Sequence, residues 1–235
     1  SAASDVYKRQ LLKRSESYIG TLIDDLVTKG TQEPYRMMTS RSEYRLVLRQ
    51  DNADQRLCPI GHRIGLVSDA RLQAVEEKYA AVEREIMRLT HTGVAGSDTL
   101  NALLTARGTA PVADGARLID LLRRPQVSYD DLRPFDPAAP ELPGAVREQV
   151  EISVKYEGYI RRQQRQVEDF EQLEKHALPD RMDYSAIQGL RLEAREKLDA
   201  VRPLNLGQAS RISGVSPADV GALMIWLQTH RDKEE

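Results

Sequence analysis

Cysteine and the larger aromatic residues are scarce in this chain of 235 residues. It has one cysteine, Cys58, one tryptophan and two phenylalanines. A single cysteine excludes an intrachain disulfide and a cysteine-based metal site. The histidines are also far apart in the sequence, so we expect no metal-binding residues among His62, His91, His176 and His230. Leu, Val, Ile, Ala and Tyr must then fill the interior, and this composition suits helices.

Long apolar runs and the usual catalytic motifs are absent as well. No apolar stretch approaches the roughly 18 residues of a membrane span, and no signal-like segment opens the chain, so we expect a cytoplasmic protein without membrane contact. The sequence has no glycine-rich phosphate loop, no GxSxG motif and no cysteine paired with a convincing general base, so we predict no catalytic residues. The formal net charge of −2 excludes a uniformly basic nucleic-acid binder, although arginines cluster locally.

Helical periodicity predicts an all-α fold. Apolar residues recur at helical spacing over 11–29, 68–89, 145–175, 190–201 and 206–212, and a last helix should follow the cap Ser216. A capping-box pattern from Ser40 to Glu43 predicts a further helix over 41–50, followed by a loop up to Ser68. We divide the chain into an expression-derived or frayed leader (1–10), the first part of a helical body (11–90), a small helical insert (91–144), a long helix with its return helix (145–203) and a terminal helix-turn-helix-like unit (204–235).

The most distinctive stretch is EPYRMMTSRSEYRLVLRQDNADQRL, residues 33–57. In the expected helix Arg41, Arg45 and Arg49 would form one row beside an apolar stripe, so their guanidinium groups would be only partly solvated. Such groups need a carboxylate or a phosphate as a partner. The residues alone favour ion pairs with nearby acids over a nucleic-acid or cofactor phosphate.

A second basic cluster lies in the predicted long helix. Tyrosine and glutamine alternate there with basic residues, an arrangement that suits phosphate contacts and stacking on unpaired bases. The candidate tRNA-binding residues are Lys155, Tyr159, Arg161, Arg162 and Arg165. A solvated helix face is an equally good interpretation. Gly158 in mid-helix predicts that another group passes close to the backbone there.

Residues 206–227 have the helix, glycine-containing turn and helix of a helix-turn-helix motif. The second helix begins with small residues and an aspartate, and it offers no side chain that reads base edges. A DNA-binding regulator is therefore disfavoured, and a protein partner or the domain's own core is favoured. A purely structural helical bundle stays open as an alternative. We take the candidate partner-binding residues to be Gly207, Gln208, Ser210, Arg211, Asp219 and Ala222.

Three long motifs together resemble the C-terminal part of the GidA/MnmG family of tRNA uridine-modifying flavoproteins. They are YIGTLIDDLVTKG, the EPYR stretch above and GLRLEAREKLDAVRPLNLGQASRISGVSPADV. One departure is Met38, where the family pattern leads us to expect an aromatic residue. The family uses FAD, NADH and a folate one-carbon donor, together with the GTPase MnmE, to modify the wobble uridine of tRNA.

The resemblance implies specific roles for this chain. We expect it to lack the N-terminal FAD-binding domain, to hold no cofactor of its own and to be inactive alone, whereas the full-length enzyme would use FAD and NADH. Arg36 and Arg45 would lie near the junction with the flavin domain and serve tRNA or the flavin site. The terminal helices would contact an MnmE-type GTPase, and the region that precedes this chain in the family could form a homodimer.

Overall fold

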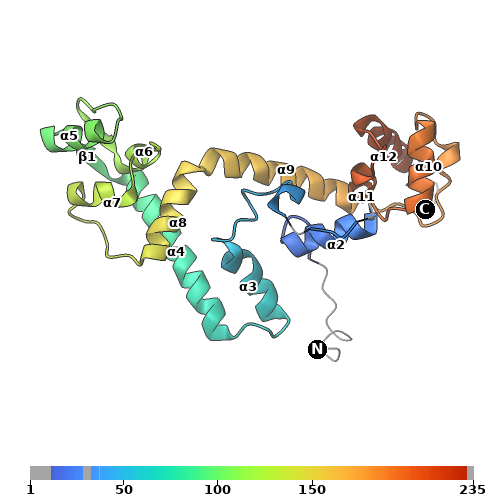
Figure 1. Ribbon diagram of the computed structural model, residues 1–235, viewed down its shortest axis with the longest axis horizontal. Helices are drawn as coiled ribbons and strands as arrows, with labels where there is room; N and C mark the ends of the chain where they lie inside the picture. Colours follow the sequence, from blue (N-terminus) through green and yellow to red (C-terminus); the bar gives the residue numbers. More distant parts are fainter. Residues whose placement is uncertain (1–11, 29–32, 37, 232–235) are drawn as a thin grey trace. The chain divides into compact units, whose positions relative to one another are not determined.

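The computed structural model describes residues 12–28, 33–36 and 38–231, and it shows a helical protein (Figure 1). Two compact units divide the chain: the first unit comprises residues 1–48 and 162–235, and the second unit comprises residues 49–161. The boundary at Arg161 and Arg162 falls within helix α9. The proposed leader, residues 1–10, lies outside the described residues. No helix in the described ranges is long and apolar enough to cross a membrane.

The long helix α4 organises the second unit. Helix α4 (Asp69–His91) packs against α3 (Ala53–Arg63), α6 (Leu118–Leu122) and α8 (Gly144–Lys155). Ser68 caps α4 by accepting a hydrogen bond from the backbone N–H of Arg71, as the sequence predicts. The remaining elements of the unit are β1 (Gly93–Ala95), α5 (Asp98–Ala106), β2 (Gly115–Arg117), α7 (Tyr129–Leu132) and the 3₁₀ turn η2 (Arg133–Phe135).

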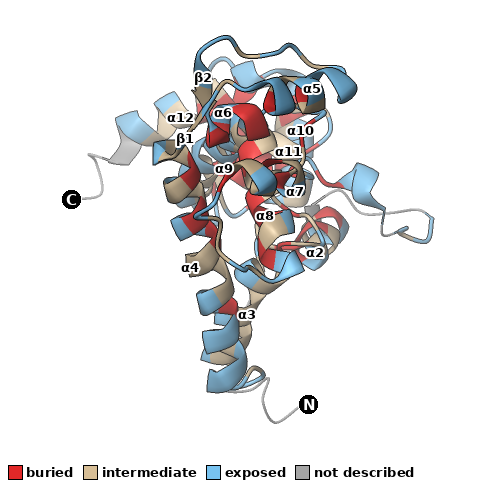
Figure 2. Cartoon of the chain, turned by 90° about the vertical axis from the view of Figure 1, so that its left-hand side faces the viewer, coloured by how far each residue is buried: buried red, intermediate tan, exposed pale blue. Residues whose placement is uncertain are grey.

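The core of the second unit lies where α4, α5, α6, α7 and α8 meet. Four of the five residues of α6 are buried, and this helix is largely red in Figure 2. Buried leucines and valines from the other helices surround it, including Leu89, Leu104 and Val150. The antiparallel strands β1 and β2 pair Val94 with Ala116 and add a two-stranded sheet to the predicted helical insert.

The first unit has two apolar clusters. The larger one is formed by α10 (Leu192–Val201), α11 (Leu206–Arg211), α12 (Pro217–Arg231) and the 3₁₀ turn η3 (Tyr184–Ala186), with Leu198, Leu206 and Leu223 fully buried. Ser216 caps α12 and Asp219 returns the bond to the Ser216 N–H, as the capping pattern predicts. Tyr44 and Leu48 pack on Val167 of α9 (Glu157–Lys175) in the smaller cluster. Helix α2 (Tyr18–Thr28) completes the unit.

Four helix predictions are wrong in whole or in part. The predicted helix 11–29 begins only at Tyr18, since residues 12–17 are irregular. Residues 41–50 form no helix: the 3₁₀ turn η1 (Thr39–Arg41) ends at Ser42, which is extended, and its hydroxyl accepts from the Tyr44 N–H. Residues 53–63 are the helix α3 instead of a loop, because Asp54 accepts hydrogen bonds from Lys78 and the Tyr79 hydroxyl and so holds α3 against α4. The predicted helix 145–175 is broken at Tyr156 into α8 and α9.

Gly158 does not mark a close approach. A Cβ atom built on it would meet nothing within 4 Å among the described atoms. The residue lies in the first turn of α9, directly after the break at Tyr156. A glycine costs least at such a helix end, so the position needs no close neighbour to explain it.

Candidate nucleic-acid interface

Gln163 joins the two basic stretches that the sequence presents as separate. Its Oε1 accepts hydrogen bonds of 2.8 Å from the backbone N–H groups of both Leu46 and Val47, and its Nε2 donates to the carbonyl of Glu43 at 3.1 Å. One side chain of α9 thus holds the whole turn 43–47 on the helix. We refer to these three hydrogen bonds as the Gln163 clamp.

Apolar packing fixes the same turn from the other side. Tyr44 and Leu48 are buried against Val167, which lies one helical turn after Gln163. Burial raises the pKa of the Tyr44 hydroxyl to about 12, so it stays protonated at neutral pH. Because Tyr44 points inward, its neighbours Glu43 and Arg45 are exposed. Arg45 lies in a hydrogen-bonded turn, in which the Val47 and Leu48 N–H groups donate to the Tyr44 carbonyl, and its side chain faces solvent.

The side-chain carboxylate of Glu43 belongs to an ion-pair network that the sequence does not predict. Arg14 is buried, and it donates to both carboxylate oxygens of Glu43 at 2.9 Å, to Asp25 at 2.7 Å and to Asp24 at 3.0 Å. A buried guanidinium with several carboxylate partners is costly to disrupt. No periodic signal marks Arg14, since it lies in the irregular stretch before α2, a region that the sequence assigns to a helix.

The arginines of the predicted row have different surroundings. Arg36, Arg41 and Arg45 are exposed in the first unit, and Arg41 stacks over the Tyr35 ring at 5.3 Å. Among the described residues, neither Arg36 nor Arg45 has a hydrogen bond or an ion pair. Arg49 belongs to the second unit and is bound by Asp51 at 3.1 Å. Because no helix forms over 41–50, the single row of partly buried guanidinium groups does not exist.

The cluster predicted around α9 also divides. In the second unit Lys155 is held by Glu151 at 2.7 Å and by the carbonyl of Pro125 at 3.2 Å, Arg161 is paired with Glu157, and Tyr159 is exposed. In the first unit Arg162 and Arg165 are exposed, and the described part of the chain gives them no acidic partner. They precede and follow Gln163 in α9. Arg36, Arg45, Arg162 and Arg165 are thus exposed cations of the first unit without an acidic partner among the described residues, and we call these four the basic surface. Arg181 and Lys197 are also exposed in this unit and also have no acidic partner among the described residues.

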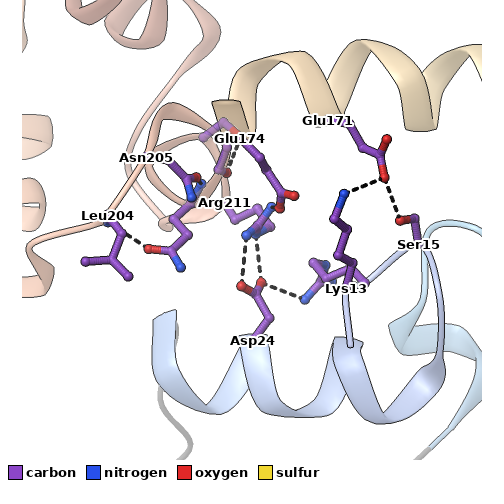
Figure 3. Close-up of polar contacts among 12 residues, drawn as sticks. Lys13, Ser15, Asp24, Glu171, Glu174, Leu204, Asn205 and Arg211 are labelled. Carbon is purple, nitrogen blue, oxygen red and sulfur yellow. Dashed lines mark hydrogen bonds and ion pairs between the residues drawn. The ribbon is translucent and has the colours of Figure 1, made fainter. Parts of the chain in front are cut away.

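The predicted partner-binding residues are largely engaged within the first unit. Arg211 contacts Asp24 at 2.7 Å, Glu174 at 3.2 Å and the Phe170 ring at 4.7 Å, and Figure 3 shows it between α2 and α9. Gly207 is buried beside Glu174, where a Cβ atom would lie 2.5 Å from the Cγ atom.

Asp219 is likewise an internal group, with 1% of its surface exposed. It accepts from Arg191 at 2.7 Å and from the Ser216 hydroxyl at 2.6 Å, and the Arg191 bond is the main cause that holds its pKa far below the usual range. Gln208, Ser210 and Ala222 are partly exposed. Ala222 also packs against the larger apolar cluster, so only Gln208 and Ser210 among the six reach the surface without a role in the core.

Two family models match the chain in succession. Residues 69–164 match the tRNA modifying enzyme MnmG/GidA C-terminal helical domain, and residues 166–235 match the tRNA modifying enzyme MnmG/GidA C-terminal helical bundle. The junction between the two matches lies in α9, close to the boundary between the two compact units.

Curated relatives and solved structures agree with these matches. The tRNA uridine 5-carboxymethylaminomethyl modification enzyme MnmG of Caldicellulosiruptor saccharolyticus is 55% identical over 93% of this chain, and that of Bacillus subtilis is 52% identical over 94%. The chain spans 35% of the length of each relative. GidA of Aquifex aeolicus superposes with a TM-score of 0.74 at 39% identity, over 92% of this chain and 33% of that structure. The chain therefore belongs to the MnmG/GidA family of tRNA-modifying enzymes, of which it contains the C-terminal helical domain and the C-terminal helical bundle.

Proposed function

We propose that this chain binds tRNA through the basic surface of its first unit and so serves the modification of the wobble uridine in the cytoplasm. The Gln163 clamp carries the proposal, since it fixes the Arg45 turn on α9, the helix that also bears Arg162 and Arg165. Exposed guanidinium groups without an internal acceptor are available to phosphate oxygens. The names of the relatives, which are tRNA uridine modification enzymes, give the class of nucleic acid.

Salt-dependent tRNA binding tests this proposal. Each phosphate contact that is lost should reduce the slope of log affinity against log salt by about 0.7 to 0.9. We expect the variant Arg45→Gln/Arg162→Gln/Arg165→Gln to show a slope reduced by about two to three such steps. The matched control is Arg84→Gln, which removes an exposed arginine of α4 in the second unit and should leave the slope unchanged. An unchanged slope in the triple variant would contradict the proposal.

Flavin chemistry is not assigned to these residues. The family resemblance implies FAD and NADH in a full-length enzyme, but dinucleotides are held by parallel strand–helix units with a glycine-rich turn. The described residues contain one antiparallel pair of three-residue strands and no parallel strand–helix unit of this kind. We propose that Arg36 and Arg45 contribute at the junction with the flavin-binding part of the relatives.

We propose further that the terminal helices bind an MnmE-type GTPase. Leu192, Leu204 and Ile225 are exposed apolar residues of the first unit, and apolar groups on a surface suit a protein partner better than phosphates. Ile225→Ser should weaken capture of the GTPase in a pull-down and leave tRNA affinity intact. Met87→Ser on α4 is the control for loss of an exposed apolar side chain. If Ile225→Ser loses tRNA and keeps the GTPase, the assignment is reversed.

A further inference from the structure

The second unit has a pocket that the basic surface does not use. It has a volume of about 680 Å³, within the range typical of small-ligand sites. The segment 123–130, helix α8 and the first turn of α9 line it. Two of its tyrosines differ sharply in exposure: Tyr129 is buried and donates its hydroxyl to Glu85, whereas Tyr159 is 60% exposed.

Two exposed aromatic rings border the pocket. Tyr156, at 47% exposure, stands at the break between α8 and α9, and Tyr159 follows within the first turn of α9. Neither side chain belongs to an apolar cluster of the described residues. Exposed tyrosines at the rim of a cavity are suited to stacking on a planar ring.

The polar groups of the pocket suit a neutral ligand rather than a free anion. Arg123 is paired with Glu157 at 3.2 Å, and Lys155 is held by Glu151. Arg147 pairs with Asp130 through one terminal nitrogen, but its Nε is buried and meets no acceptor in the described structure. Three basic and three acidic residues line the cavity, so its formal charges balance.

One acceptor remains available to a ligand. It is Glu148, an exposed lining residue of α8 whose carboxylate has no donor among the described residues. The edge of a nucleobase offers the complementary N–H donors.

We propose that this pocket holds one unpaired nucleobase of the bound tRNA. The base stacks on Tyr156 or Tyr159, and its edge donates a hydrogen bond to Glu148. The inference rests on the proposed tRNA binding and adds a second kind of tRNA contact. The basic surface binds phosphates, whereas this pocket binds a base. Proteins recognise RNA by stacking splayed-out bases of loops in this manner.

The test measures tRNA affinity of the complete chain across a range of salt concentrations. Tyr156→Ala/Tyr159→Ala should lower the affinity by about 5- to 150-fold, the range that corresponds to one stacked base. The salt slope should stay unchanged because stacking releases no counterions. Tyr156→Phe/Tyr159→Phe should bind like the unaltered chain, since the rings remain. Met87→Ala, which removes a side chain of 61% exposure from α4, is the control for a surface truncation.

A second measurement identifies the base directly. Anticodon stem-loop RNAs that each carry one abasic loop position are bound to the unaltered chain and to Tyr156→Ala/Tyr159→Ala, in which both changes are confined to exposed side chains. One abasic position should weaken binding to the unaltered chain and have no further effect on the variant.

Three outcomes would overturn the inference. Equal tRNA affinity of the unaltered chain and the double alanine variant would refute the pocket and leave the basic surface standing. Loss of GTPase capture with unchanged tRNA affinity would make the pocket a protein contact. Absence of any salt-dependent tRNA binding by the unaltered chain would remove the proposed function together with this inference.

Discussion

Replacing Gln163 with alanine tests whether RNA binding depends on the position of the Arg45 turn, because the substitution leaves the charge of the basic surface unchanged. The substitution removes the Gln163 clamp without changing any charged group. The Val47 N–H keeps a second acceptor, the carbonyl of Tyr44 at 3.1 Å, whereas the Leu46 N–H loses the acceptor recorded here and the Glu43 carbonyl loses a donor. The substitution therefore removes all three hydrogen bonds of the clamp, and the Val47 N–H has a second acceptor already in place.

The size of the effect follows from these contacts. Each hydrogen bond contributes about 0.5 to 1.5 kcal/mol net, and water can reach this partly exposed turn, so we expect a local loss of about 1 to 2 kcal/mol. Tyr44 and Leu48 remain packed on Val167, and the Arg14 network still holds Glu43. The turn should thus open more often while the unit stays folded.

Hydrogen exchange and tRNA binding report the two consequences. The Leu46 amide should exchange about 5- to 30-fold faster in Gln163→Ala, the equivalent of 1 to 2 kcal/mol. The salt slope of tRNA binding should fall by about 0.7 to 0.9 as the Arg45 contact is lost. Gln164→Ala is the matched control, because Gln164 is exposed on the same helix. Faster exchange with an unchanged salt slope would show that the clamp does not position Arg45 for RNA, and unchanged exchange would refute the clamp itself.

Three further substitutions test contacts inside the units. Asp219→Asn should lower the free energy of unfolding by about 2 to 3 kcal/mol at pH 7, since charge-assisted bonds from Arg191 are lost. Because the pKa of Asp219 is depressed in the folded state, the stability difference between the unaltered chain and Asp219→Asn should be fully present above the unfolded pKa of about 3.9 and disappear as the pH falls well below it. Urea titrations at pH 7 and pH 3 that give equal stability differences would contradict this role of the Asp219 carboxylate. Glu85→Ala should cost about 3 kcal/mol or more in urea unfolding, because Arg88 and the Tyr129 hydroxyl lose their buried acceptor, whereas the exposed Glu83→Ala should be nearly neutral. Gly20→Ala should destabilise the first unit by about 1 to 3 kcal/mol, since its Cβ would lie 2.2 Å from the Lys13 carbonyl oxygen, and an unchanged thermal midpoint would exclude that close approach.

Elements specified by local signals are the ones that the sequence predicts well. Helix α4 begins after the Ser68 cap, and its apolar stripe buries Val75, Val82 and Leu89. Helix α12 begins with its Ser216 capping box. In both cases the cap and the apolar stripe lie within one segment of chain, so short-range hydrogen bonding and periodicity contain the required information.

The errors arise where a distant residue decides the local structure. The turn 43–47 has helical periodicity, but its N–H groups are taken by Gln163, more than a hundred residues away. Helix α3 contains Pro59, which argues against a helix, yet the bonds from Lys78 and Tyr79 to Asp54 hold it on α4. Tertiary contacts of this kind override propensity, and a single sequence does not reveal them.

The same distinction explains which cations of the candidate site can serve RNA. Arg49 and Arg161 look equivalent to Arg45 and Arg162 in the sequence, but each has an acidic residue within four positions that neutralises it. Arg45 has Glu43 as a neighbour too, yet that carboxylate is taken by the buried Arg14. The buried Arg14 thus affects the basic surface indirectly: because it binds Glu43, the Arg45 guanidinium stays available to a phosphate. Substitution of Arg14 should consequently weaken RNA binding even if the fold survives, because the Glu43 carboxylate would be free to pair with Arg45.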